Sequence, residues 1–159
     1  TLLFMASRAQ LVAEVVRPAL QAGKTVLCDR FISATCAYQV AAGFPREQVL
    51  ELGRYAVGDT WPDLTIVLDV PPEVGCARTG RKGGPPRRRR SADLGQTALF
   101  EGSRPDAMER RPLKFHERVR ELFRELPRVY PTPVVVIDGS RDVDAVFQDV
   151  QEAVRRAFV

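Results

Sequence analysis

Apolar residues in the first part of the chain recur at helical spacing. Between Leu2 and Ala22 they stand three or four positions apart, which predicts one long helix. Pro18 lacks the backbone N–H that the helical ladder needs, so a kink is expected there. Gly23 stands where a glycine commonly ends a helix. The pattern therefore predicts a single kinked helix that stops at Gly23.

Three short runs are apolar throughout instead of alternating. They lie at 25–28, 63–70 and 134–138, and each is bounded by turn residues. Continuous apolar runs are typical of strands that are covered on both faces, as in a parallel sheet. The sequence therefore predicts three strands in a parallel sheet.

Helical patterns separate these runs. Residues 33–57 predict two helices, broken around Gly43 and Pro45, and further helices are expected at 71–78, at 108–126 and after a capping Asp142. Alternating strands and helices indicate an α/β fold with three layers, a parallel sheet between two layers of helices. We expect residues 1–159 to form a single α/β domain. Residues 79–107 lack any period and predict a loop.

Composition fits a globular protein, because apolar residues make up 45% of the 159 residues. Much of the positive charge behind the net charge of +4 lies at 81–90, so it is a property of that segment and not of the whole surface. Cys28, Cys36 and Cys76 form no CxxC pair, which favours reduced thiols. The single histidine argues against an ordinary zinc site. No run is long enough to span a membrane, so a cytoplasmic protein is expected.

Each of the three predicted strands ends at or beside an aspartate, namely Asp29, Asp69 and Asp138. Ligands of parallel α/β sheets bind outside the carboxyl ends of the strands, and an aspartate there can help to hold Mg²⁺ on phosphates. Turn residues follow Asp69 and Asp138 at once, which favours a turn role for both. Asp29 differs because Arg30 follows it, and a guanidinium at a strand end can bind a phosphate through two hydrogen bonds.

A second unusual pair lies on the first helix. Phe4 and Arg8 are neighbours one turn apart on the face that continues to Leu11, so an arginine interrupts an apolar stripe. Arg8 could extend to the helix edge, as arginines on apolar surfaces often do. Alternatively, Phe4 could stack on a planar ring while Arg8 donates to the polar edge of that ring. The residues alone leave both interpretations open.

Several segments together resemble the bacterial thymidylate kinases. They are "LLFMASRAQLV", "PALQAGKTVLCDRF", "TCAYQ", "WPDLTIVLDVPPEVGCAR" and "VVVIDGS", and they follow one another in register over nearly the whole chain apart from the loop at 79–107. The resemblance implies a P-loop NTPase-like fold and transfer of a phosphate from ATP, with Mg²⁺, to dTMP. It also implies two nucleotide partners, dTMP and ATP, and pairing of two copies as a homodimer.

The resemblance assigns roles to individual residues. Phe4 would stack on thymine, and Arg8 would hydrogen-bond the edge of that base. Arg30 would bind the dTMP phosphate and the transferring phosphoryl group, and Asp29 would lie near the acceptor and, indirectly, near Mg²⁺. The remaining substrate contacts would come from Thr35 facing the base, Tyr38 against the deoxyribose and Gln39 behind the base.

The chain departs from the family pattern in the phosphate-binding loop. It contains no G-x-x-x-x-G-K-[ST], and Gly23-Lys24-Thr25 precedes a predicted strand instead of following one. The family's P-loop strand, loop and helix come before the stretch that matches Thr1. We therefore expect this chain to represent the C-terminal two-thirds of a kinase domain, with an acceptor site but a fold incomplete at its N-terminus and no activity by itself.

The predicted loop at 79–107 departs as well. It corresponds to the family's lid but is longer, and Arg81 and Lys82 at its base are the candidate cations for ATP, with Arg81 also a candidate catalytic residue. Glu109 retains the acidic end of the family's D-R-x-E signature. The arginines at 87–90 could instead contact nucleic acid nonspecifically.

Two other functions remain open at this point. One is a related P-loop kinase with another nucleoside or nucleotide as its substrate, because a pocket can change on a constant scaffold. The other is a catalytically inactive protein that binds nucleic acid through the arginine-rich loop.

Overall fold

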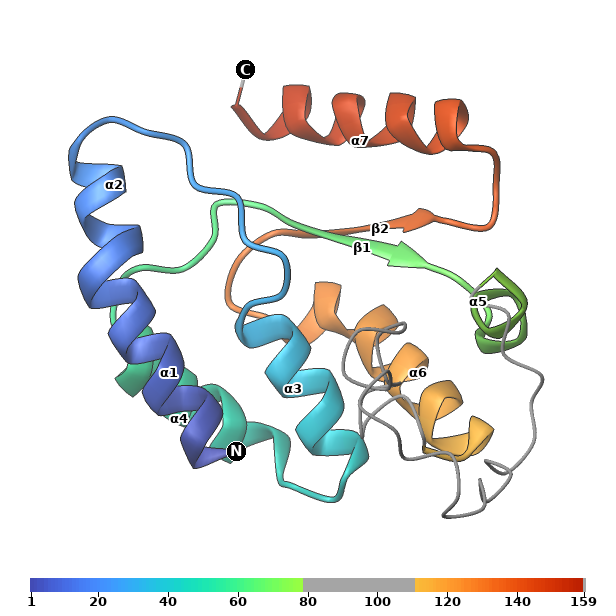
Figure 1. Ribbon diagram of the computed structural model, residues 1–159, viewed down its shortest axis with the longest axis horizontal. Helices are drawn as coiled ribbons and strands as arrows, with labels where there is room; N and C mark the ends of the chain where they lie inside the picture. The colour runs from blue at the N-terminus through green and yellow to red at the C-terminus, as the bar shows by residue number, and fades with distance from the viewer. Residues whose placement is uncertain (79–110, 159) are drawn as a thin grey trace, which may run out of the picture.

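The computed structural model describes residues 1–78 and 111–158. Figure 1 shows the helices and strands in these two stretches. The predicted loop at 79–107 lies outside the described residues, and so do Arg81, Lys82, Glu109 and the arginines at 87–90. Their roles stay predictions.

Two parallel strands form the sheet. β1 (Thr65–Asp69) pairs with β2 (Val134–Asp138), and the register runs from Thr65 opposite Val134 to Asp69 opposite Asp138. Helix α7 (Val143–Phe158) covers one face, and α6 (Leu113–Val129) lies against the other (Figure 1). The predicted parallel arrangement in three layers is therefore confirmed for the described residues.

The prediction of a strand at 25–28 is wrong. Residues 24–28 form no strand, and Leu27 is 97% exposed. A strand needs a ladder of hydrogen bonds to a neighbour, and no such ladder joins this segment to another in the described part of the chain. An apolar run alone therefore did not suffice for a strand here.

The first predicted helix is divided in three. α1 (Leu2–Leu11) continues through a π-helical turn, η1 (Val12–Val16), into α2 (Arg17–Gln21). The disruption that the sequence placed at Pro18 thus appears as a π-helical turn just before it. Gly23 ends the helix at φ 71°, and the N–H of Lys24 donates to the carbonyl of Ala19 at 3.0 Å. This is the glycine cap that the sequence predicted.

The core lies where α3 (Ile32–Ala41) packs between α4 (Arg46–Val57) and α6. Every residue from Ile32 to Ala37 is buried. The largest fully buried side chains are Ile32, Leu126, Val12, Val49 and Val57. Both α3 and α4 appear within the predicted range 33–57, separated at Gly43 and Pro45 as expected.

The turns after the strands differ from one another. Asp138 accepts hydrogen bonds from the hydroxyl of Ser140 at 2.5 Å and from its backbone N–H at 2.9 Å, which confirms its turn role. These bonds hold the pKa of Asp138 below its usual value. Asp142 caps α7 by accepting from the N–H of Ala145 at 2.9 Å, as predicted.

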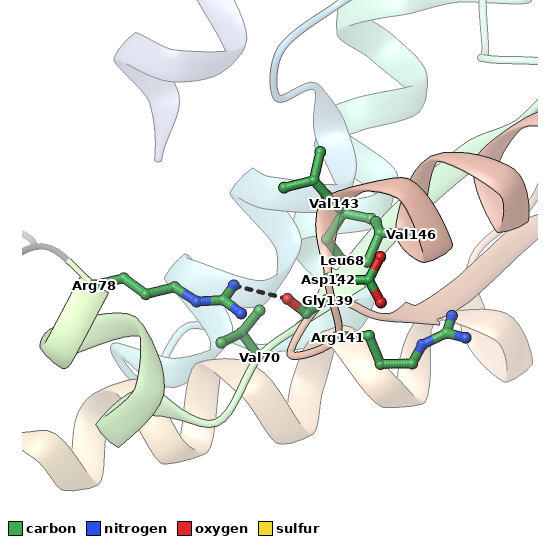
Figure 2. A pocket seen from close by; sticks show the side chains of 8 residues that line it. All are labelled: Leu68, Val70, Arg78, Gly139, Arg141, Asp142, Val143 and Val146. Carbon is green, nitrogen blue, oxygen red and sulfur yellow. Dashed lines mark hydrogen bonds between the residues drawn. The ribbon is translucent and has the colours of Figure 1, made fainter.

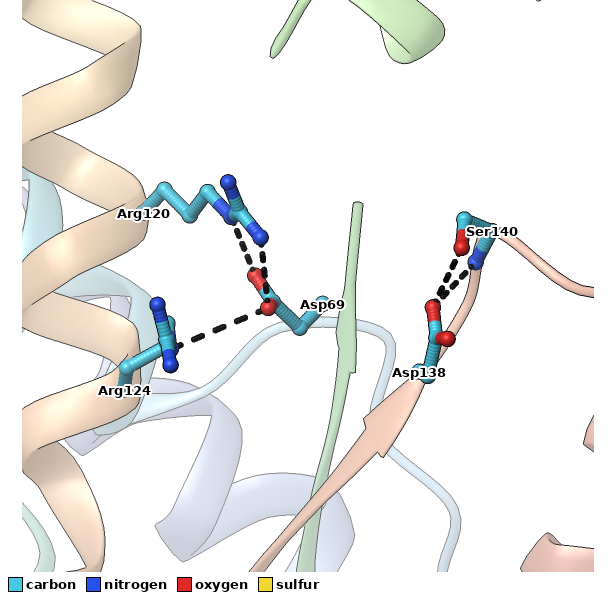
Figure 3. A network of polar contacts seen from close by, with 5 residues as sticks. All are labelled: Asp69, Arg120, Arg124, Asp138 and Ser140. Carbon is cyan, nitrogen blue, oxygen red and sulfur yellow. Dashed lines mark hydrogen bonds and ion pairs between the residues drawn. The ribbon is translucent and has the colours of Figure 1, made fainter. Parts of the chain in front are cut away.

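Asp69 does not play the turn role expected of it. Its carboxylate accepts two hydrogen bonds from Arg120 of α6, at 2.7 and 2.9 Å, and Arg124 lies 3.8 Å away (Figure 3). The side chain of Asp69 is only 15% exposed, so the carboxylate has lost much of its contact with water. The hydrogen bonds from Arg120 raise the pKa of its guanidinium above the usual value. The pair ties the end of β1 to α6.

We predict that Arg120→Met lowers the free energy of unfolding by about 1–3 kcal/mol, because Asp69 then keeps only the more distant Arg124. Arg120→Lys should cost less, since an ammonium keeps the charge but not the two parallel hydrogen bonds. Urea unfolding at neutral pH measures both changes.

Arg156→Met is the matched control. Arg156 pairs with Glu152 on the surface of α7, and its side chain is 78% exposed, so its loss should change the free energy of unfolding by less than about 0.5 kcal/mol. Equal effects of the two methionine variants would contradict a special role for the Asp69–Arg120 pair.

The turn after β2 is packed closely against the end of β1. A Cβ added to Gly139 would lie 2.8 Å from Cγ2 of Val70 and 3.2 Å from Cβ of Leu68. The N–H of Gly139 also donates to the carbonyl of Asp69 at 2.9 Å, which limits how far the turn can move. A side chain at position 139 would therefore require Val70, and to a smaller extent Leu68, to shift.

We predict that Gly139→Ala lowers the free energy of unfolding by about 1–3 kcal/mol through overpacking. Gly75→Ala on α5 (Pro72–Arg78) is the control, because an added Cβ meets no atom within 4 Å there. That substitution should leave stability unchanged or raise it by up to about 1 kcal/mol, since alanine favours helix. The thermal unfolding midpoints of the two variants test this prediction. An unchanged midpoint in Gly139→Ala would refute the close packing of the turn against the end of β1.

Candidate functional site

The predicted substrate residues come from three neighbouring pieces of the chain. Phe4 and Arg8 lie on α1, Asp29 and Arg30 form the bend before α3, and Tyr38 lies on α3 itself. Contacts between the pieces hold them together: the guanidinium of Arg8 lies over the ring of Phe31, which directly follows the bend. The structure thus brings the two predicted pairs into one region.

Arg30 has an unusual backbone and an aromatic support. Its φ of 68° lies in the left-handed region, which costs a residue with a side chain about 1–2 kcal/mol. Its Cζ lies 5.5 Å from the centre of the Tyr38 ring, within the range of a cation–π contact. Arg30 is exposed, and no carboxylate pairs with it among the described residues. Its charge is therefore available to an anion.

Arg8 is supported in the same way. Its Cζ lies 5.4 Å from the centre of the Phe31 ring, and Phe31 is itself buried. Within residues 1–78 and 111–158 no carboxylate pairs with Arg8 either. Phe4, one turn before it, is 54% exposed and presents an aromatic ring at the surface. The sequence left two interpretations open: Arg8 extends to the helix edge, or Phe4 stacks on a planar ring while Arg8 donates to the edge of that ring. This geometry agrees with the second interpretation.

The α3 residues differ in how accessible they are. Thr35 is only 6% exposed, whereas Tyr38 and Gln39 are partly buried. The hydroxyl of Thr1 donates to Oε1 of Gln39 at 2.8 Å, which links the start of α1 to α3. Gln39 and Tyr38 are therefore the α3 side chains that can meet a ligand most directly, and contact of Thr35 with a base stays a prediction.

Asp29 is the candidate carboxylate for Mg²⁺. It is exposed and makes no ion pair within the described residues, and no group of three or more potential metal ligands occurs among them. Mg²⁺ is often held by one or two carboxylates together with water and the phosphates of a substrate. A single exposed carboxylate beside Arg30 fits this indirect mode of binding but not an all-protein site.

A pocket of about 690 Å³ lies at the carboxyl ends of β1 and β2 (Figure 2). Its lining is mostly apolar and consists of Leu68, Val70, Arg78, Gly139, Arg141, Asp142, Val143 and Val146. This edge of the sheet is where parallel α/β folds bind ligands.

Arg78 is a cation of this pocket that sequence reasoning missed. It ends α5, and its guanidinium donates to the carbonyls of Gly139 at 2.8 Å and Ser140 at 2.9 Å. Figure 2 shows its guanidinium extending toward the turn after β2. The sequence analysis favoured Arg81 and Lys82 instead, because contacts between α5 and a turn much later in the chain leave no local signal.

Two further predictions concern cysteines and membranes. None of the three cysteines forms a disulfide; Cys36 is buried, and its burial raises the pKa of the thiol. None of the helices in the described stretches is both long and apolar enough to cross a bilayer. Leu2, Leu3 and Val15 expose apolar surface on the first helices, but the predicted homodimer is not tested by this structure.

Comparison with known proteins extends the resemblance. The sequence model of the thymidylate kinase family matches residues 1–150. The chain is 40% identical over 156 residues to a thymidylate kinase of Geobacter sp. strain M21, covering 98% of this chain and 63% of that protein. It is 41% identical over 155 residues to one from Nitratidesulfovibrio vulgaris, covering 96% of this chain and 66% of the relative.

A third relative agrees with these two. The thymidylate kinase of Symbiobacterium thermophilum is 38% identical over 158 residues, which cover 99% of this chain and 64% of that protein. The chain thus spans 63–66% of the length of these curated relatives. The family has the P-loop NTPase fold, which agrees with the parallel strands and the helices on both faces. The match over most of the chain shows that it belongs to the thymidylate kinase family.

Proposed function

We propose that the protein containing this chain transfers the γ-phosphate of ATP to dTMP and so forms dTDP and ADP. A phosphate oxygen of dTMP attacks the γ-phosphorus, and the bond from that phosphorus to the oxygen bridging it to the β-phosphate breaks. The observation that carries the proposal is the placement of the Arg30 side chain. Its guanidinium rests on the Tyr38 ring without a carboxylate partner in the described stretches, next to Asp29.

The acceptor dTMP would lie between α1 and α3. Phe4 offers a ring on which thymine can stack, and Arg8, held over Phe31, can donate to the polar edge of the base. Arg30 would bind the phosphate end. In a transfer of this kind the protein contributes mainly position and charge, so fixed cations are the groups that matter most.

The donor ATP would place its base in the pocket at the ends of β1 and β2. The lining of that pocket is mostly apolar, which suits a planar base, and Arg78 is part of it. Mg²⁺, when bound with ATP, would neutralise charge on the phosphates, with Asp29 as its indirect protein neighbour. Arg81, Lys82 and Glu109 remain proposed contacts to ATP, with Arg81 also proposed to act on the transferring phosphoryl group. Since ATP is the proposed donor, a cytoplasmic location is part of the proposal.

A related kinase with another acceptor remains the alternative to test. Tyr38 is central to that choice, because a ring beside the sugar of the acceptor would disfavour a 2′-hydroxyl. Nothing in the described residues favours the nucleic-acid-binding alternative, whose arginines at 87–90 lie outside them.

Activity of the full-length protein tests the proposal directly. We expect ADP formation with ATP, Mg²⁺ and dTMP, and much slower turnover with dUMP, dGMP or thymidine, measured by a coupled assay. Arg30→Ala should lower kcat/KM for dTMP by about 10²–10³-fold, because it removes a fixed cation from the developing charge. Arg30→Lys should retain part of the activity, since a point charge replaces the two-pronged donor.

Arg54→Ala is the control for the arginine substitution. Arg54 is exposed near the end of α4 and lies outside the proposed site, so its loss should leave kcat and KM unchanged. Near wild-type turnover in Arg30→Ala would remove Arg30 from the mechanism. Faster turnover of another nucleotide than of dTMP would replace the substrate assignment.

A further inference from the structure

Tyr38 is the centre of a group of aromatic rings. Its ring centre lies 6.4 Å from that of Phe115 and 6.1 Å from that of Phe123, with the Phe123 ring edge-on at 83°. Both distances are within the range of favourable aromatic pairs. Phe115 and Phe123 are two turns apart on α6 and therefore reach Tyr38 from one face of that helix.

The rings have a rigid seat. Ala37, Val119 and Leu122 are buried together where α3 meets α6, and Tyr38, Phe115 and Phe123 pack against them. Val119 lies one turn after Phe115 and one turn before Phe123, so the ring contacts continue the buried stripe of α6. Tyr38 thus cannot reorient without disturbing this packing.

Cations lie at both ends of the ring group. Arg30 rests on Tyr38, with its Cζ 5.5 Å from the ring centre, and Arg111 rests on Phe115 at 5.0 Å. Since no carboxylate in the described stretches pairs with Arg30, the Tyr38 ring is the main side-chain contact that the structure gives its guanidinium. Any contact that fixes the orientation of the Tyr38 ring therefore also fixes the position of the Arg30 guanidinium.

We propose that Phe115 and Phe123 are positioning residues for the acceptor site: they hold the Tyr38 ring, and the ring holds the Arg30 guanidinium. The inference rests on the proposed function, in which Arg30 binds the acceptor phosphate. Neither phenylalanine touches substrate; each acts through Tyr38. Loss of either ring lets Tyr38 turn and leaves Arg30 with more orientations, of which fewer meet the phosphate.

Steady-state kinetics of the full-length protein test this role. Phe115→Leu and Phe123→Leu keep apolar volume but remove the ring, and each should lower kcat/KM for dTMP about 3- to 10-fold while the KM for ATP stays unchanged. Phe115→Tyr keeps a ring and should retain the wild-type values. Phe158→Leu is the matched control, because Phe158 is exposed and makes no ring contact within the described residues.

A double-mutant cycle separates positioning from stability. In a Tyr38→Leu background, Phe115→Leu should have almost no further effect on kcat/KM for dTMP, because the ring through which it acts is gone. Full additivity of the two substitutions would overturn the proposal. A loss of thermal stability in Phe115→Leu with an unchanged KM and kcat for dTMP would overturn it too.

A measurement without turnover keeps the inference separate from the proposed function. The Nε–H resonance of Arg30 in a ¹⁵N NMR spectrum should carry a ring-current shift from Tyr38, which Tyr38→Leu removes. Phe115→Leu should reduce this shift, and Phe158→Leu should not. If the protein fails to phosphorylate dTMP, the proposed function is wrong. The ring-current shift still tests whether α6 positions Arg30. An unaltered shift in Phe115→Leu would refute that positioning role.

Discussion

The burial of the first half of α3 is the constraint on which the rest of the structure depends. Residues Ile32–Ala37 are all buried between α4 and α6, and full burial of one large aliphatic side chain such as Ile32 contributes about 1.5–3 kcal/mol. Phe31 is buried as well, so the buried stretch begins directly after Arg30 and the chain has little freedom in the way it enters the helix. The left-handed φ of Arg30 is therefore a strain that α3 packing offsets. Arg30 lies at the surface beside Asp29, which is exposed as well, while the residues that follow it are buried.

Arg120 on the one hand and Arg8 and Arg30 on the other are held in two distinct ways. Arg120 satisfies a mostly buried carboxylate through two hydrogen bonds, which neutralises both charges and leaves neither for a ligand. Arg8 and Arg30 instead rest on aromatic rings, which orient a guanidinium without cancelling its charge. An arginine that is oriented but not neutralised is suited to bind an anion. This contrast separates the structural cations from the candidate binding ones without reference to any relative.

Local patterns in the sequence predicted the elements that depend on local interactions. The breaks at Gly43 and Pro45, the cap at Gly23 and the cap at Asp142 all involve residues within a few positions of one another, and the structure has each of them. The strands β1 and β2 were also found, because each supplies the ladder that the other needs. The apolar run at 25–28 has the same composition but no partner strand in the described stretches, so composition alone misled.

Contacts between distant residues account for what the sequence left out of the candidate site. Asp69 was expected to serve its own turn, but α6 presents Arg120 to it, and no spacing rule relates positions 69 and 120. Arg78 at the pocket and Phe115 beneath Tyr38 were missed for the same reason. The pairs Phe4–Arg8 and Asp29–Arg30 could be singled out because their members are neighbours in sequence. Residues that are far apart in the sequence and meet only in the folded chain cannot be found from local patterns.

Helix α6 connects the two regions of the site. At 3.6 residues per turn, Arg120 lies about 140° around the helix from Phe115, so the two side chains serve different neighbours. Arg120 fixes the end of β1 beside the pocket, while Phe115 and Phe123 fix Tyr38 and through it Arg30. Any rotation of α6 about its axis would move both sets of contacts at once. The orientation of one helix therefore sets the positions of the proposed donor and acceptor regions together, and the hydrogen bonds from Arg120 to Asp69 oppose that rotation along with the buried side chains Val119, Leu122 and Leu126.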